Sequence, residues 1–190
     1  MTGGAILLAA GASRRFGSDK RRHVLADGTP LMISSLRLYA AAYTELIVVL
    51  RPEDTALAET VRAEAPAGNV RIAFCPDAHL GMGHSLACGA REAAGWSYLF
   101  VALADMAWVR PATLARLVAA MDGAGRDAVV QPVHRGTPGH PVGFGSALFA
   151  RLERLTGDEG ARAVMRGAGA NVLRLEVDDP GVLRDLDAPA

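Results

Sequence analysis

The sequence has few cysteines, no net charge and no long hydrophobic segment, and each of these features excludes a class of protein. Cys75 and Cys88 are the two cysteines of the chain, and their spacing fits neither a CxxC redox motif nor a zinc site. The 20 basic and 20 acidic residues give a formal net charge of zero, so no overall field draws the protein to nucleic acid or to anionic lipid. An anionic ligand would have to be bound by a local group of charges.

The apolar stretches of the chain are too short for a membrane protein. They are far below the roughly 20 residues that a transmembrane helix needs, and no basic segment precedes the first of them, as a secretory signal would require. We therefore expect a soluble, cytoplasmic protein with reduced thiols that binds neither membranes nor nucleic acid. The length of 190 residues suits a single domain that spans 1–190.

Short apolar runs recur along the chain and predict buried strands. They lack polar alternation, which is typical of strands that are covered on both faces. The predicted strands are 5–10, 45–50, 69–75, 98–103, 127–133 and 172–177, and helical spacing predicts helices at 29–42, 52–65, 82–94 and 111–121. Proline belongs in the first turn of a helix, so Thr29 before Pro30 and Arg110 before Pro111 indicate helix starts. This alternation predicts an α/β fold, a Rossmann-like three-layer αβα sandwich with a mostly parallel central sheet.

The alternation becomes less regular after Val133. A loop, a short segment GFG and two helical stretches, 146–155 and 158–166, precede the last predicted strand. We interpret residues 134–170 as a lid or second lobe of the same domain.

The first predicted strand runs directly into a cationic loop. Gly11 and Gly17 would let backbone amides approach a ligand closely, while Arg14, Arg15 and Lys20 supply positive charge. Phosphate groups bind this combination of donors, and in a parallel sheet ligands bind beyond the carboxyl ends of the strands. The loop matches neither the Walker A motif nor GxGxxG. A solvated turn with ordinary surface cations is the alternative.

The loop also resembles a known signature. Residues 8–20, LAAGASRRFGSDK, resemble LAAGxSxRxGxxK of the nucleotidyltransferases, most closely that of the molybdenum cofactor cytidylyltransferase family. Later segments are similar to further motifs of that family in the same order: CPDAHLGMGHSLACGA (75–90), GTPGHPVGF (136–144), LTGDEGARAVM (155–165) and DLDAP (185–189). The resemblance covers almost the whole chain and implies a fold of the nucleotide-diphospho-sugar transferase type.

The resemblance further implies a reaction. The protein would transfer CMP from CTP to the terminal phosphate of molybdopterin that carries molybdenum, and pyrophosphate would be released. A molybdenum hydroxylase would receive the product. Arg15, Lys20 and Asp105 are the implied catalytic residues, Asp105 and Asp187 would bind Mg²⁺, and His140 would bind the acceptor from the 134–170 lobe. The implied nucleotide-binding residues are Leu8, Ala9, Ala10, Gly11, Ser13, Gly17, Gly81 and Ser85.

Two positions decide how far the resemblance extends. The family carries GDxP where this chain has Ala104, Asp105, Met106 and Ala107. Because the glycine and the proline are missing, the resemblance does not predict the path of the backbone at Asp105. Related guanylyltransferases carry LAGG where this chain has LAAG, and the methyl group of Ala10 would narrow a pocket that a purine must enter, which favours cytosine. Two alternatives stay open: another transferase of this fold that uses GTP or a sugar or polyol phosphate, or a non-enzymatic protein that binds and delivers the cofactor.

One further short motif is similar to that of an unrelated class of enzyme, the α/β-hydrolases. The pentapeptide GHSLA (83–87) is one residue away from GxSxG, the nucleophile elbow of α/β-hydrolases. An elbow requires a strand that runs directly into its serine, whereas residues 76–84 separate the predicted strand from Ser85. The spacing therefore disfavours a hydrolase, and Ser85 is better placed to cap a helix or to contact a nucleotide base.

Overall fold

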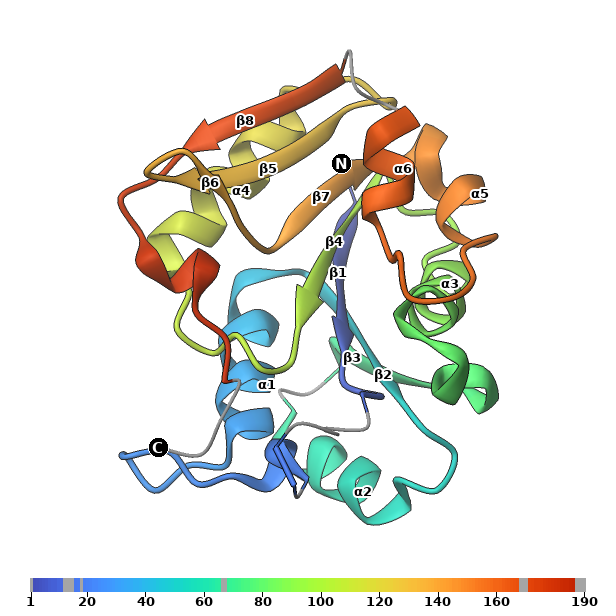
Figure 1. Cartoon of the computed structure of the whole chain (residues 1–190), viewed down its shortest axis with the longest axis vertical. Helices are drawn as coiled ribbons and strands as arrows, with labels where there is room; N and C mark the ends of the chain where they lie inside the picture. The colour runs from blue at the N-terminus through green and yellow to red at the C-terminus, as the bar shows by residue number, and fades with distance from the viewer. Residues whose placement is uncertain (1, 12–15, 18, 66–67, 168–170, 187–190) are drawn as a thin grey trace.

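A parallel half-sheet forms the first part of the structure, which is a computed structural model describing residues 2–11, 16–17, 19–65, 68–167 and 171–186 (Figure 1). Its strands lie in the order β3-β2-β1-β4. Their bounds are β1 (Gly3–Leu8), β2 (Glu45–Leu50), β3 (Val70–Phe74) and β4 (Tyr98–Leu103). The sequence predicts all of these strands, and β2 and β4 have the predicted ends.

Helices cover both faces of the sheet. One face carries α1 (Leu31–Ala42), α2 (Thr55–Glu64) and α4 (Pro111–Asp122), and the other carries α3 (Met82–Arg91), α5 (Phe149–Leu152) and α6 (Arg162–Gly167). Successive side chains of a strand point to opposite faces, so Leu7 of β1 packs under the first set of helices and Ile6 under the second. In the described parts of the chain, no helix combines the length and hydrophobicity of a membrane span.

Strands of both directions complete the sheet. They are β5 (Val129–His134), β6 (Thr137–Pro138), β7 (Val142–Gly145) and β8 (Val172–Glu176). β7 lies between β4 and β5 and is antiparallel to both, whereas β8 is parallel to β5. The described residues thus form a mixed, mostly parallel sheet of eight strands between helical layers, which confirms the predicted three-layer α/β sandwich.

β7 is absent from the sequence prediction because glycine obscures it. A Cβ atom at Gly143 would lie 2.7 Å from both Met121 Cε and Phe100 Cε1, so a larger residue here would have to displace these side chains of α4 and β4. Glycine weakens the local signal for a strand, and tertiary packing decides the conformation instead. Within the range 134–170, interpreted above as a lid or second lobe, this segment is therefore an internal strand of the sheet.

Each predicted helix differs from the structure at one end or both: 52–65 is α2, 82–94 is the shorter α3, and 158–166 is α6, which starts at Arg162. Pro111 occupies the first turn of α4 as expected, but α1 begins at Leu31, because Pro30 pairs with Val24 in an isolated bridge before the helix. The expected helix 146–155 is a 3₁₀ turn followed by the short α5.

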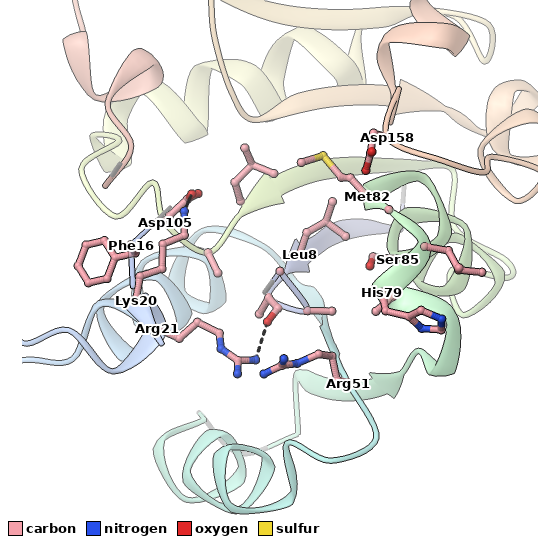
Figure 2. Close-up of a pocket in the computed structure, with 18 of the residues that line it drawn as sticks. Leu8, Phe16, Lys20, Arg21, Arg51, His79, Met82, Ser85, Asp105 and Asp158 are labelled. Carbon is pink, nitrogen blue, oxygen red and sulfur yellow. Dashed lines mark hydrogen bonds and ion pairs between the residues drawn. The ribbon is translucent and has the colours of Figure 1, made fainter. Parts of the chain in front are cut away.

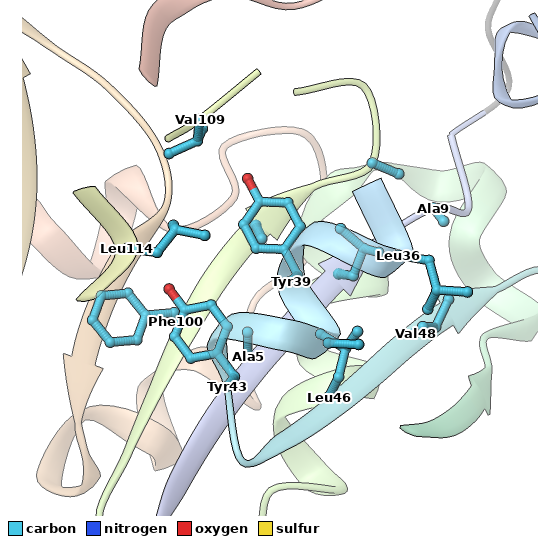
Figure 3. Close-up of a cluster of buried hydrophobic side chains, with 14 of the residues drawn as sticks. Ala5, Ala9, Leu36, Tyr39, Tyr43, Leu46, Val48, Phe100, Val109 and Leu114 are labelled. Carbon is cyan, nitrogen blue, oxygen red and sulfur yellow. The ribbon is translucent and has the colours of Figure 1, made fainter. Parts of the chain in front are cut away.

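Aromatic packing fixes α1 against the strands (Figure 3). Tyr39 and Tyr43 stack with ring centroids 6.3 Å apart, and Tyr43 contacts Phe100 of β4 at 5.2 Å. All three side chains are buried, and burial raises the pKa of the Tyr43 hydroxyl well above its usual value. Stacked and tilted aromatic pairs stabilise a core beyond the area that they bury, so this packing holds the end of α1 against β4.

Candidate functional site

A pocket of about 500 Å³ opens at the carboxyl ends of β1 and β4 (Figure 2). The strand order reverses between these two strands, and this is the place where open α/β sheets bind their ligands. The lining comes from residues 8–11, from Phe16, Lys20, Arg21 and Leu31, from Arg51 and Glu53 after β2, from residues 78–82 and Ser85, from residues 103–105 and from Asp158. The loops that follow the first and fourth strands thus both contribute to the wall.

Lys20 and Asp105 meet at one end of this pocket. Nζ of Lys20 lies 2.5 Å from Oδ2 of Asp105, although the residues are 85 positions apart in the sequence. The 3₁₀ helix η1 (Lys20–Arg22) presents the ammonium group, and the turn after β4 presents the carboxylate. Their side chains are 23% and 16% exposed, so a ligand can reach both. An ammonium group suits phosphate oxygens, and a carboxylate suits a hard divalent cation.

Two side chains of α1 hold the backbone on either side of Asp105. The Ser35 hydroxyl donates to the carbonyl of Ala104 at 2.8 Å, and the Tyr39 hydroxyl donates to the carbonyl of Met106 at 3.3 Å. Burial and the charge of Asp105 raise the pKa of Tyr39, so its hydroxyl keeps the proton that it donates. These contacts fix the direction in which Asp105 leaves the sheet.

The same contacts explain how the chain departs from the GDxP pattern. Ala104 and Met106 are buried, and the amide of Ala104 donates to the carbonyl of Leu8 at 3.1 Å. The segment is therefore held by the core and by β1 without the glycine and proline of the family. The support from Ser35 and Tyr39 was not predicted from the sequence, in which a serine within the apolar stretch of α1 was the available signal.

Residues 8–11 form the wall of the pocket as the chain leaves β1. The amide of Ala9 donates to the carbonyl of Val49 at 3.0 Å, so this wall stays attached to the sheet after β1 ends. Ala10 is buried and lines the pocket, and its effect on the choice of base stays a prediction. Gly17 has φ +74°, a conformation that favours glycine. Ser13, Arg15 and Asp187 lie outside the described residues, and their roles stay predictions.

A second group of charges lies beside this wall. Arg21 is 5% exposed and binds both carboxylate oxygens of Asp54, at 2.6 and 2.8 Å. Burial alone would raise the pKa of Asp54, but hydrogen bonds from Arg21 and Arg51 hold that pKa well below its usual range. The hydrogen bonds from Arg21 likewise lower the pKa of Asp19. No role was predicted for Arg21 or Asp54, and the position of Asp54 shortly after a buried strand was the available signal.

The start of α3 packs backbone to backbone against a distant loop. The amide of Gly83 donates to the carbonyl of Gly157 at 2.7 Å, and Gly81 has φ +131°. This contact brings Asp158 to the rim of the pocket, where Figure 2 shows it near Met82. Two segments that the resemblance singled out, GMGHS and TGDEG, are therefore neighbours in space.

We expect Gly83→Ala to separate these segments. A Cβ atom at Gly83 would lie 2.6 Å from the carbonyl oxygen of Thr156, so backbone must move, which lowers the free energy of unfolding by about 1–3 kcal/mol. Urea unfolding measures this change. Gly123→Ala is the control, because its Cβ would lie 3.9 Å from the nearest carbonyl oxygens and should change stability by less than about 1 kcal/mol. A Gly83→Ala protein as stable as the wild type would contradict the packing.

The position of Ser85 excludes a nucleophile elbow. β3 ends at Phe74, the 3₁₀ helix η2 (Pro76–Leu80) follows, and α3 then begins at Met82. Ser85 lies in the first turns of α3, is buried and faces the pocket. Because a helical turn rather than a strand precedes α3, the strained geometry of the hydrolase motif cannot form here.

His140 reaches the same edge of the sheet by a different route. β7 runs opposite to β4, so Val142 at its start pairs with Val101 near the end of β4, and His140 precedes it. Burial lowers the pKa of His140, and its Nδ1 is buried without a hydrogen-bond partner among the described residues. The pocket lining, as far as the described residues define it, does not include His140. Its role toward the acceptor stays a prediction.

The chain matches one protein family along most of its length and has a relative of similar length. Residues 5–175 match the family described as the MobA-like NTP transferase domain. The purine catabolism protein PucB of Bacillus subtilis is 36% identical over 97% of this chain and 91% of its own length.

Solved structures share the fold over nearly the whole chain. The homologue of Mycobacterium tuberculosis Rv0371c from Mycobacterium sp. strain JC1 is 26% identical with a TM-score of 0.81, and the match covers 98% of this chain and 90% of that one. A nucleotidyl transferase from Methanothermobacter, Mth528, is 22% identical with a TM-score of 0.79, covering 98% of this chain and 92% of that one.

Proposed function

Because the chain belongs to the MobA-like NTP transferase family, we propose that it transfers CMP from CTP to the terminal phosphate of molybdenum-bearing molybdopterin. The family makes the chain a nucleotidyltransferase, and the proposal adds the donor, the acceptor and a molybdenum hydroxylase as recipient of the product. The observation that carries it is the Lys20–Asp105 pair in the pocket at the ends of β1 and β4.

The reaction needs orientation and charge neutralisation more than proton transfer. A phosphate monoester has a second pKa of about 6, so the acceptor is already a dianion near neutral pH and requires no general base. One of its oxygens attacks the α-phosphorus of CTP, the bond between the α-phosphorus and the bridging oxygen breaks, and pyrophosphate leaves. Lys20 would bind the phosphates and offset the charge that grows on the leaving group.

The residues present fit a magnesium ion. Mg²⁺ is usually held by one or two carboxylates together with substrate phosphates and water, rather than by a cage of protein ligands. Asp105 supplies one such carboxylate at the pocket wall, and no three His, Cys, Asp or Glu residues cluster as metal ligands in the described regions. Asp105 and Asp187 would hold the ion, which when bound would neutralise charge on the transferring and leaving phosphates.

The choice of cytosine depends on the wall beside Ala10. Ala10 and Ser85 both line the pocket. On this proposal, the methyl group of Ala10 would reduce the width available to a base, and the hydroxyl of Ser85 would donate a hydrogen bond to it. A pyrimidine needs less width than a purine. This supports CTP over GTP as the donor.

Thermal unfolding with each nucleotide tests this choice. With Mg²⁺ and CTP at about 100 times Kd, stabilisation by mass action is about 2.7 kcal/mol, which raises Tm by about 5–10 °C for a chain of this size. We expect a smaller shift with GTP at the same concentration. A larger shift with GTP would overturn the assignment of the base.

Pyrophosphate release tests the complete reaction. CTP, Mg²⁺ and molybdenum-bearing molybdopterin together should release pyrophosphate, and omission of the acceptor should stop the release. Release only with a sugar or polyol phosphate would point to another transferase of this fold. Binding of the cofactor without any release would instead support a delivery protein.

A further inference from the structure

We propose that Arg21 is a positioning residue that fixes both ends of the glycine and arginine loop, residues 10–18, and thereby aims Lys20 at the nucleotide phosphates. The inference rests on the proposed function, because it concerns the same pocket. It assigns a role to a residue that lies in the pocket wall but matches no position of the loop signature.

All hydrogen-bond donors of the Arg21 guanidinium are in use. An arginine side chain carries five N–H groups. Nε donates to Asp19 Oδ1 at 2.7 Å, and Nη2 donates to Asp19 Oδ2 and Asp54 Oδ1, both at 2.8 Å. Nη1 donates to Asp54 Oδ2 at 2.6 Å and to the carbonyl of Ala9 at 2.9 Å. Arg21 therefore has no donor left for a ligand, although it reaches the pocket, and it acts through the protein groups that it binds.

Those groups belong to three segments that meet at the loop. Ala9 directly follows β1 and is the last residue before the loop, Asp19 directly follows the loop and precedes Lys20, and Asp54 stands at the start of α2. Asp19 also accepts from the amide of Arg21 at 3.2 Å, which fixes η1. A single guanidinium thus joins the entry and the exit of the loop to the rest of the domain.

Stability alone is a weak reason for such a group. The cost of removing charges from water offsets most of the attraction within a buried ion pair. The planar fork of arginine, by contrast, can address several acceptors at fixed angles, which the single ammonium of lysine cannot do. Figure 2 shows Arg21 and Arg51 side by side, and both bind Asp54, so Asp54 is itself held in place. The contacts of Arg21 are therefore suited to holding Ala9, Asp19 and Asp54 at fixed positions relative to one another.

The test is the binding of Mg²⁺–CTP to folded variants. Arg21→Lys keeps the charge but loses the fork, so one group no longer holds both Ala9 and Asp19, and the position of Lys20 must be fixed at the expense of binding energy. We expect Kd to rise about tenfold. Arg22→Lys is the matched control, because the Arg22 side chain is 68% exposed and its Nε lies 3.8 Å from Asp19 Oδ2. The Arg22→Lys protein should bind Mg²⁺–CTP with the Kd of the wild type. Asp19→Asn provides a second variant at a less buried position, with an expected rise of about threefold.

A double-mutant cycle separates positioning from general destabilisation. If Arg21 acts through Lys20, then Arg21→Lys adds little further loss of affinity in a Lys20→Ala background. Wild-type affinity in Arg21→Lys, or equal losses with and without Lys20, would overturn the inference and leave the proposed function intact. If Arg21→Lys does not fold, wild-type affinity in Asp19→Asn overturns it. A wild-type protein that binds no nucleotide would overturn the proposed function first.

Discussion

Asp105→Asn is expected to reduce the rate of pyrophosphate release about a thousandfold while the fold is retained. The substitution keeps the shape of the side chain but removes its charge and replaces one acceptor oxygen with an amide donor, and binding of a cation and of Lys20 depends on that charge. The hydrogen bonds from Ser35 and Tyr39 go to neighbouring carbonyl groups, so the turn should keep its path. Turnover at saturating substrate and urea unfolding measure the two expectations separately.

Asp122→Asn is the matched control for this change. Asp122 is exposed at the end of α4, so its loss should alter neither turnover nor, beyond about 0.5 kcal/mol, stability. Near-normal turnover in purified Asp105→Asn would remove Asp105 from the reaction.

Lys20→Ala should lower kcat/KM about a hundred- to thousandfold. The Lys20 ammonium group lies beside Asp105 in the pocket. Alanine at this position would remove the positive charge that binds the phosphates. Stability should fall by less than about 1 kcal/mol, because the pair with Asp105 is partly solvated. Steady-state kinetics and urea unfolding of the same preparation measure both effects.

Arg22→Ala serves as the comparison for Lys20→Ala. It removes a positive charge two residues along the same turn of η1, from an exposed side chain. If Arg22→Ala lost as much kcat/KM as Lys20→Ala, general electrostatic attraction rather than a specific contact would explain the effect.

Much of the sheet could be predicted because its strands are encoded locally. β2 and β4 are continuous apolar runs, and covering both faces of a strand requires such runs. β7 could not be predicted in this way, since Gly143 fits the close approach of Phe100 and Met121, and these contacts exist only in the folded sheet.

The same distinction between local sequence signals and contacts made only in the folded protein applies to the site. Lys20 and Asp105 were identified from short motifs, each next to a predicted strand, and the structure brings them together. The residues that support them were not identified, because Ser35 and Arg21 act on groups that are far away in the sequence or in another element. Periodicity reports which side of a helix is buried, but it does not report which backbone carbonyl a buried hydroxyl will meet.

The antiparallel insertion of β7 has a consequence for synthesis of the chain on the ribosome. When the residues up to β4 have emerged, the parallel strands β3-β2-β1-β4 can already pair, yet the outer edge of β4 lacks its neighbour until Val142–Gly145 follows. The sequence of β4, YLFVAL, is apolar and buried along most of its length in the finished protein, and an open apolar strand edge promotes association between chains. A nascent chain in which β4 has emerged and β7 has not therefore presents an open apolar strand edge to other chains.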